Sequence, residues 1–159
     1  MIGVKFITLG TLKESYLREA AAEYEKRLGG YCRFQNVQLK EEKLSDSPSE
    51  NEIKSALERE GRKIMAEIPQ RAYKIAMCVE GKQHSSEELA RKIEDISEGY
   101  GEVCFIIGSS HGLDESVKNA CDMRLSVSKL TFPHQLMRVM LLETVYRSFN
   151  IIKGTKYHK

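Results

Sequence analysis

The sequence predicts an α/β domain built on a mainly parallel sheet with helices on both faces. Segments with strand character alternate along the whole chain with segments whose apolar residues recur at helical spacing. Residues 73–79 (YKIAMCV) and 103–107 (VCFII) are nearly continuous apolar runs, which is typical of strands buried on both faces. The 159 residues contain no repeat, low-complexity tract or domain boundary, so we expect a single domain over residues 1–159.

The first half of the chain predicts two strands and two helices. Gly29 and Gly30 end a stretch of helical periodicity that begins at Tyr16. Gly61 lowers the helix propensity of the second helical segment. The expected elements are a strand over residues 2–9, a helix over 16–28, a strand over 31–39, a polar loop over 40–50 and a helix over 53–68.

The second half continues the alternation. Ser85 and Glu88 have the spacing of a capping box, and Asp114 is suited to cap a short helix. Pro133 suits the first position of the final helix. The expected elements are strands over residues 73–79, 103–107 and 125–127, and helices over 85–99, 114–121 and 133–149.

The composition is that of a globular protein, with 41% hydrophobic and 30% charged residues. The net charge is only +2, but residues 129–159 carry six Lys or Arg and one Glu, a net charge of +5. A basic C-terminal third suits a polyanionic partner such as RNA, and a solvated basic tail is the alternative.

The cysteines indicate a reducing compartment. Cys32, Cys78, Cys104 and Cys121 form no Cys-x-x-Cys pair, and we interpret all four as reduced, buried thiols of a cytoplasmic protein. We expect no zinc site, because ligands at metal spacing are missing. The first ten residues are too short and mixed for a signal peptide, and no stretch reaches the roughly 18 apolar residues of a membrane span.

Two loops are candidates for ligand binding. Residues 108–112 (GSSHG) follow a buried strand, which places them at the carboxyl edge of the sheet, where ligands bind in open α/β folds. Their spacing matches neither the dinucleotide fingerprint nor a P-loop, and an ordinary strand-to-helix turn remains the alternative. Residues 125–135 (LSVSKLTFPHQ) form a hydroxyl-rich loop that suits adenosine, or simply connects to the last helix.

The final helix and the tail are the third candidate. The helix is apolar nearly all round, so it needs cover on more than one side, and a homodimer would supply it. His134 and Arg138 share one face, and we expect Arg138 to pair with a carboxylate or an RNA phosphate. The tail over residues 154–159 (GTKYHK) suits contact with bases and phosphates, with a frayed terminus as the alternative.

Four stretches together resemble the RlmH family of SPOUT methyltransferases. Residues 131–159 (TFPHQLMRVMLLETVYRSFNIIKGTKYHK) are similar to the C-terminal signature of that family. The likeness extends to residues 5–31, to residues 79–90 (VEGKQHSSEELA) and to residues 105–117 (FIIGSSHGLDESV). It covers essentially the whole chain.

The resemblance implies a specific enzyme. Its C-terminal part would form a deep trefoil knot, a rare exception among protein chains. It would be a homodimer that methylates N3 of a pseudouridine in large-subunit (23S) ribosomal RNA on the assembled ribosome, with S-adenosylmethionine as the donor. The implied donor-binding residues are Met77, Gly108, Val127, Ser128, Lys129, Leu130, Thr131 and Phe132.

The implied chemistry assigns roles to four further residues. N3 of a uracil ring is an imide that must lose its proton, and histidine is the natural base near neutral pH. We therefore expect His134 to act as the base or to position it, and Arg138 to steady the substrate. Tyr157 and His158 would contact the RNA across the dimer. No metal is required, because the donor carries its own leaving group.

Two other functions compete with this hypothesis. A non-catalytic ribosome-associated RNA-binding protein would account for the basic tail but not for the two loops, and it would not bind S-adenosylmethionine. A nucleotide-dependent oxidoreductase would share the fold class, but the dinucleotide fingerprint is missing.

Overall fold

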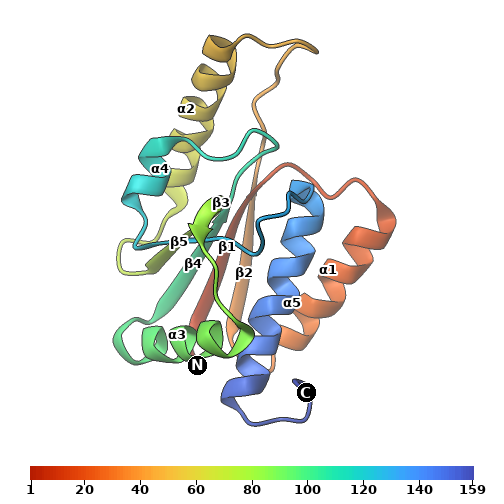
Figure 1. The fold of residues 1–159 in the computed structure, drawn as a ribbon, viewed down its shortest axis with the longest axis vertical. Helices are drawn as coiled ribbons and strands as arrows, with labels where there is room; N and C mark the ends of the chain where they lie inside the picture. The colour runs from red at the N-terminus through yellow and green to blue at the C-terminus, as the bar shows by residue number, and fades with distance from the viewer.

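The protein has one five-stranded sheet in which every pair of neighbouring strands is parallel (Figure 1). The computed structural model describes all residues from 1 to 159. The strand order is β2-β1-β4-β3-β5. The sheet is thus entirely parallel, which confirms the predicted fold class. The strands are β1 (Gly3–Leu9), β2 (Arg33–Leu39), β3 (Tyr73–Lys82), β4 (Glu102–Ile107) and β5 (Met123–Leu125).

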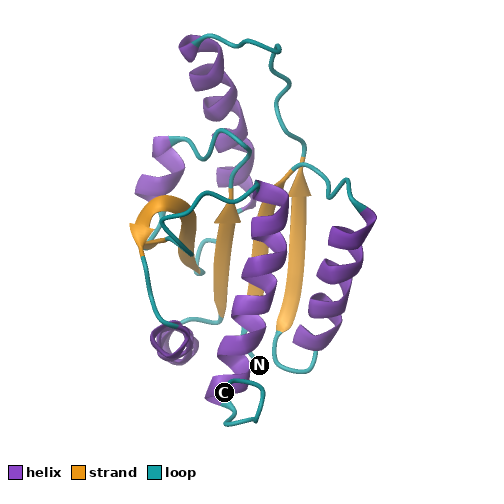
Figure 2. Cartoon of the chain, turned by 45° about the vertical axis from the view of Figure 1, so that its right-hand side comes forward, coloured by secondary structure: helices purple, strands orange, loops and turns teal.

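Helices cover both faces of the sheet, as predicted (Figures 1 and 2). One face carries α1, α3 and α5, and the other carries α2 and α4. Neighbouring residues of a strand point to opposite faces, so Phe6 belongs to the core under α5 and Ile7 to the core under α2. The helices are α1 (Ser15–Leu28), α2 (Glu50–Glu67), α3 (Ser86–Gly99), α4 (Glu115–Ala120) and α5 (His134–Ile152).

Local signals explain most helix boundaries. The capping box predicted at Ser85 is present at the start of α3, and a second box at Ser49, which the sequence reading missed, starts α2. Pro133 is the N-cap of α5 and not its first residue, and α5 continues past Phe149 to Ile152. β2 begins two residues later than predicted, because residues 31 and 32 turn back to hydrogen-bond the last carbonyl of α1.

The predicted bounds of β3 and β5 were wrong, and in both cases the pairing between these two strands explains the difference. β3 continues beyond its apolar run, because Lys82 pairs with Leu125 past an irregularity in the ladder. Gly81 permits this approach, since a Cβ there would lie 2.6 Å from the carbonyl carbon of Leu125. β5 ends at Leu125. The backbone N–H of Ser126 makes a last bond to the carbonyl of Lys82 (3.0 Å), and its hydroxyl donates to the carbonyl of Ser128 (2.9 Å), which turns the chain into the following loop.

Gly61 does not interrupt α2, although glycine disfavours the helix there. The residue is buried against α4, and a Cβ at this position would lie 3.2 Å from Cβ of Asp114 and 3.3 Å from Cγ2 of Val117. The missing side chain lets α4 lie close to α2. This packing offsets a propensity cost of roughly 1 kcal/mol.

The four cysteines are free thiols, as predicted, but only two are buried. Cys32 and Cys104 lie in the core, whereas Cys78 and Cys121 are partly exposed, so the expectation of four buried thiols was wrong. Cys78 follows the last β3 residue that pairs with β4, and Cys121 is the C-cap of α4. No helix combines the length and hydropathy needed to cross a bilayer.

Candidate functional site

A cavity of about 360 Å³ opens at the carboxyl edge of the sheet, and we call it the rim pocket. It lies between the end of β3, the loop over residues 108–114 that follows β4, and the segment over residues 126–132 that leads to α5. Its volume is within the range of small-molecule sites. Of the predicted donor-binding residues, those that line it are Met77, Gly108, Val127, Ser128, Leu130, Thr131 and Phe132. Lys129 is exposed and is not among the lining residues.

The glycine loop after β4 is a tight turn, held by a hydrogen bond of 2.9 Å from the backbone N–H of Gly112 to the carbonyl of Ser109. Gly112 has a φ of 88°, which favours glycine. A Cβ on Gly108 would lie only 2.3 Å from the carbonyl oxygen of Gly112. Only glycine fits at residue 108, because the turn brings the backbone of Gly112 against it.

The segment over residues 126–132 is shaped by its own hydroxyl groups. Ser126 donates to the carbonyl of Ser128, and the hydroxyl of Ser128 accepts from the backbone N–H of Leu130 (3.0 Å). Both hydroxyls therefore stabilise the loop itself. Leu130 has 71% of its surface exposed at the pocket, whereas Met77 is buried in the wall. The pocket thus combines apolar walls with backbone hydrogen-bonding groups.

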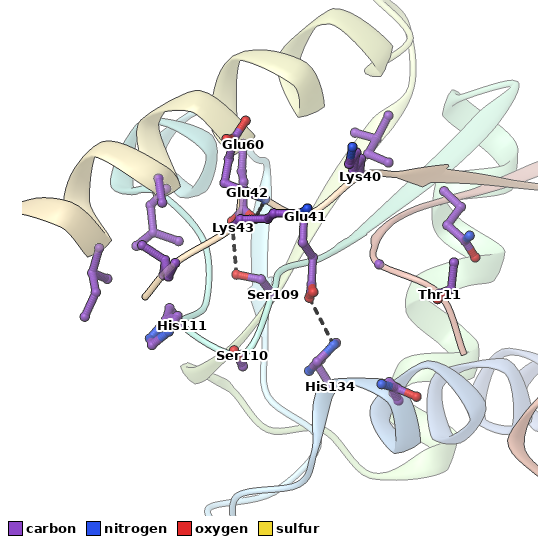
Figure 3. Close-up of a pocket in the computed structure, with 18 of the residues that line it drawn as sticks. Thr11, Lys40, Glu41, Glu42, Lys43, Glu60, Ser109, Ser110, His111 and His134 are labelled. Atoms are coloured by element: carbon purple, nitrogen blue, oxygen red, sulfur yellow. Dashed lines mark hydrogen bonds and ion pairs between the residues drawn. The ribbon is translucent and has the colours of Figure 1, made fainter. Parts of the chain in front are cut away.

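A second cavity, of about 680 Å³, adjoins the rim pocket and shares Ser109, Ser110, His111 and His134 with it (Figure 3). His134 is the first residue of α5, and its Nε2 lies 3.2 Å from Oε1 of Glu41. Glu41 belongs to the segment between β2 and α2, which we had described only as a polar loop. Its buried Oε1 has no hydrogen bond of good geometry, so the contact with His134 is an ion pair when His134 is protonated.

Glu60 of α2 hydrogen-bonds to two loops around this cavity, and the sequence analysis did not predict it. Only 3% of its surface is exposed. One carboxylate oxygen accepts from the hydroxyl of Ser109 (3.0 Å), and the other accepts from the backbone N–H of Glu42 (3.0 Å). The signal was present, because a charged residue lies between Ala56 and Ile64 on the buried stripe of α2.

Arg138 is 9% exposed, and its partners lie within the chain. Its Nη1 donates to Oε1 of Gln38 (2.9 Å), and its Nη2 lies 3.9 Å from Oε1 of Glu25. The sequence predicted a carboxylate or an RNA phosphate as the partner of Arg138, and within the chain that partner is the carboxylate of Glu25. Burial lowers the pKa of Arg138, and Glu25 opposes that shift. Burial raises the pKa of Glu25, against the effect of Arg138. The Nε of Arg138 is buried without a partner.

The tail folds back onto the far end of α5 (Figure 2). The hydroxyl of Tyr157 donates to Oε1 of Glu143 (3.0 Å), and the guanidinium of Arg147 lies 4.8 Å from the ring centroid of Tyr157. Burial, and then the bond to Glu143, raise the pKa of Tyr157 to about 12. The Nε2 of His158 lies 2.8 Å from Oε1 of Glu87. Within one chain, these residues do not meet His134.

The fold and the rim pocket define an α/β protein with a cavity of small-molecule size at the carboxyl edge of a parallel sheet. A family model described as "Predicted SPOUT methyltransferase" matches residues 2–158. The chain is 47% identical over 157 residues to the ribosomal RNA large subunit methyltransferase H of Streptococcus thermophilus, covering 98% of this chain and 99% of that protein. It is 45% identical over 159 residues to the protein of the same name from Leuconostoc mesenteroides, covering 99% and 100%.

The chain therefore belongs to the SPOUT methyltransferase family and, within it, to the ribosomal RNA large subunit methyltransferase H (RlmH) family. This membership confirms the resemblance found in the sequence. It also agrees with the position of the rim pocket, which is formed by loops that carry the family signatures at residues 105–117 and 131–159.

Proposed function

We propose that the protein transfers a methyl group from S-adenosylmethionine to N3 of a pseudouridine in 23S ribosomal RNA, on the assembled ribosome in the cytoplasm. Its membership of the RlmH family over nearly the whole chain carries this proposal. The rim pocket and the positive charge of the C-terminal third add support.

The rim pocket fits the chemistry of the donor. Buried Met77, Ile107 and Leu125 offer an apolar surface for adenine, and the backbone of residues 126–132 offers hydrogen bonds to its edge. The glycine loop, with Gly108 in its lining, forms the other side of the pocket. The bound donor supplies a methyl group on a positively charged sulfur, so the protein's part is to align the attacking nitrogen and exclude water.

His134 is the base in this proposal. It lies on the wall shared by the rim pocket and the second cavity, where it can reach both the donor and a ring brought beside it. Its contact with Glu41 orients the imidazole and stabilises the imidazolium that forms when His134 takes the N3 proton. In this proposal Arg138, one helical turn further along α5, steadies the substrate and its developing negative charge.

The active site is completed across a homodimer in this proposal. Glu143, the partner of Tyr157, is nine residues from His134, which corresponds to about 13 Å along the helix. Tyr157 and His158 are therefore remote from the pocket of their own chain and free to serve the pocket of the partner subunit. We also expect the C-terminal part to form the deep trefoil knot of the SPOUT family.

The test combines donor titration with mapping of the modified nucleotide. Calorimetric titration should show binding of S-adenosylmethionine at the rim pocket. Ribosomes from cells that lack the protein should gain one methyl group on a pseudouridine of 23S ribosomal RNA when the protein and donor are added, as read by mass spectrometry of RNA fragments. Absence of donor binding would favour a non-catalytic RNA-binding protein, and methylation of another nucleotide would overturn the proposed substrate.

A further inference from the structure

The second cavity is a feature that the proposed donor site leaves without an occupant. It is formed by the β1–α1 loop, the segment over residues 38–44, the first half of α2, the glycine loop and the start of α5 (Figure 3). Its wall toward the rim pocket is made by residues 109–111 and by His134. A molecule in the second cavity therefore lies next to the proposed base and next to the proposed methyl donor.

The acidic groups that line the second cavity are already engaged. Glu60 accepts two hydrogen bonds within the protein. Glu42 pairs with Lys63 (2.7 Å) and Arg59 (3.3 Å), and the bond to Lys63 is the main cause of its lowered pKa. Glu41 faces His134. None of these carboxylates forms an ion pair with a lysine of the cavity lining.

The basic groups at the same cavity are free. Lys13, Lys40 and Lys43 all line it, all are exposed, and none forms an ion pair. Their ammonium groups are therefore exposed and unpaired at the cavity, where they can meet an anionic group. Ile53 and Leu57 of α2, which are both half-buried, add apolar surface to the cavity lining. Positive charge and apolar surface together suit a nucleotide, which has phosphate and a flat apolar ring.

We propose that the second cavity receives the RNA segment that carries the target nucleotide, with Lys13, Lys40 and Lys43 on its phosphates and the base directed toward His134. This inference rests on the proposed function and adds where the RNA binds. The lysines hold the backbone without reading sequence, and the wall shared with the rim pocket brings the ring to the methyl donor. The alternative occupant of the second cavity is the amino-acid end of S-adenosylmethionine, which also carries charge.

The experiment compares two variants that lose the same charge. K13A/K40A/K43A removes the three lysines of the cavity. K26A/R62A/R71A removes three exposed basic residues that neither line the cavity nor form ion pairs. A third variant, K13Q/K40Q/K43Q, keeps much of the side-chain length. The rate of methylation of ribosomes is measured over a range of salt concentrations, and the donor Kd is measured by calorimetry.

We expect kcat/KM for ribosomes to fall about tenfold in both cavity variants, since exposed charge pairs contribute up to about 1 kcal/mol each. The slope of log kcat/KM against log salt should become shallower by about 2, because three contacts to a single strand are lost. The control variant and every donor Kd should match the wild type.

An unchanged kcat/KM and salt slope, or an equal loss in the control variant, would overturn the inference. A weakened donor Kd in the cavity variants would assign the cavity to the amino-acid end of the donor. If the wild type itself methylates no ribosomes, the proposed function fails first.

Discussion

Replacement of Gly108 by alanine tests whether the glycine loop holds the methyl donor. The new Cβ would lie 2.3 Å from the carbonyl oxygen of Gly112 and 3.0 Å from Cγ of Leu113. Real Cβ atoms essentially never come closer than 3.0 Å to another heavy atom, so the backbone at Gly112 must retreat by roughly 0.7 Å. Because a backbone carbonyl is the obstacle, no rotamer change relieves the clash.

The expected cost is that of overpacking, about 1–3 kcal/mol. If donor binding requires the wild-type loop conformation, the same strain weakens the donor Kd by roughly 5- to 150-fold. Any part of the strain that the free protein retains does not affect Kd and instead lowers Tm, by about 2–4 °C for each kcal/mol. Isothermal titration calorimetry and thermal unfolding monitored by circular dichroism measure the two effects separately.

Gly99→Ala is the matched control for this variant. Gly99 is the last residue of α3, and a Cβ there meets no atom within 4 Å. This variant should bind the donor as the wild type does and unfold at the same or a slightly higher temperature. If Gly108→Ala binds S-adenosylmethionine with the wild-type Kd while remaining folded, the glycine loop does not form the donor site and our assignment of the rim pocket is wrong.

Three further predictions concern the proposed base, the tail and a thiol. His134→Ala should lower the single-turnover rate of methyl transfer by about 10²- to 10⁴-fold with the donor Kd retained, and an unchanged rate and pH profile would remove His134 from the reaction. Deletion of residues 157–159 should abolish methylation and leave donor binding nearly intact, whereas loss of donor affinity would contradict a role in RNA contact. Cys78 lines the rim pocket and burial raises its pKa, so alkylation by iodoacetamide should rise with pH up to that raised pKa and slow when the donor is bound. Cys104, whose pKa burial raises to about 12, should not react in either state, and equal labelling of Cys78 with and without donor would place the donor away from β3.

The fold was largely predictable because its signals are local. Apolar runs identified β3 and β4, helical periodicity identified α1, Pro133 marked the start of α5, and a capping box marked the start of α3. The order of the strands and the bounds of β5 were not predictable in this way. β5 has only three residues, and its position depends on pairing with β3, which lies some 50 residues earlier in the chain. No local periodicity reports such a pairing.

The site was predictable only where a motif carried it. Of the eight donor-binding residues that the family resemblance implied, seven line the rim pocket, including Gly108 and Phe132. The supporting contacts were missed, because Glu60 meets Ser109 across 49 positions and Arg138 meets Gln38 across 100. A charged residue on a buried helical face indicates that a polar partner exists, but the sequence alone does not say which one.

Glu60 shows why the two cavities belong to one site. Burying a carboxylate is costly unless both oxygens are hydrogen-bonded, and hydrogen bonds to a charged group contribute about 1.5–3 kcal/mol each. The two donors come from different loops: Ser109 lies in the glycine loop of the rim pocket, and Glu42 lies in the segment that carries Lys40 and Lys43 at the second cavity. A displacement of either loop breaks a bond to the same buried charge, so the two loops are fixed relative to one another. In the proposed enzyme, a single side chain of α2 therefore positions both the loop that holds the donor and the segment that meets the RNA. This keeps the methyl group aligned with the ring nitrogen that attacks it.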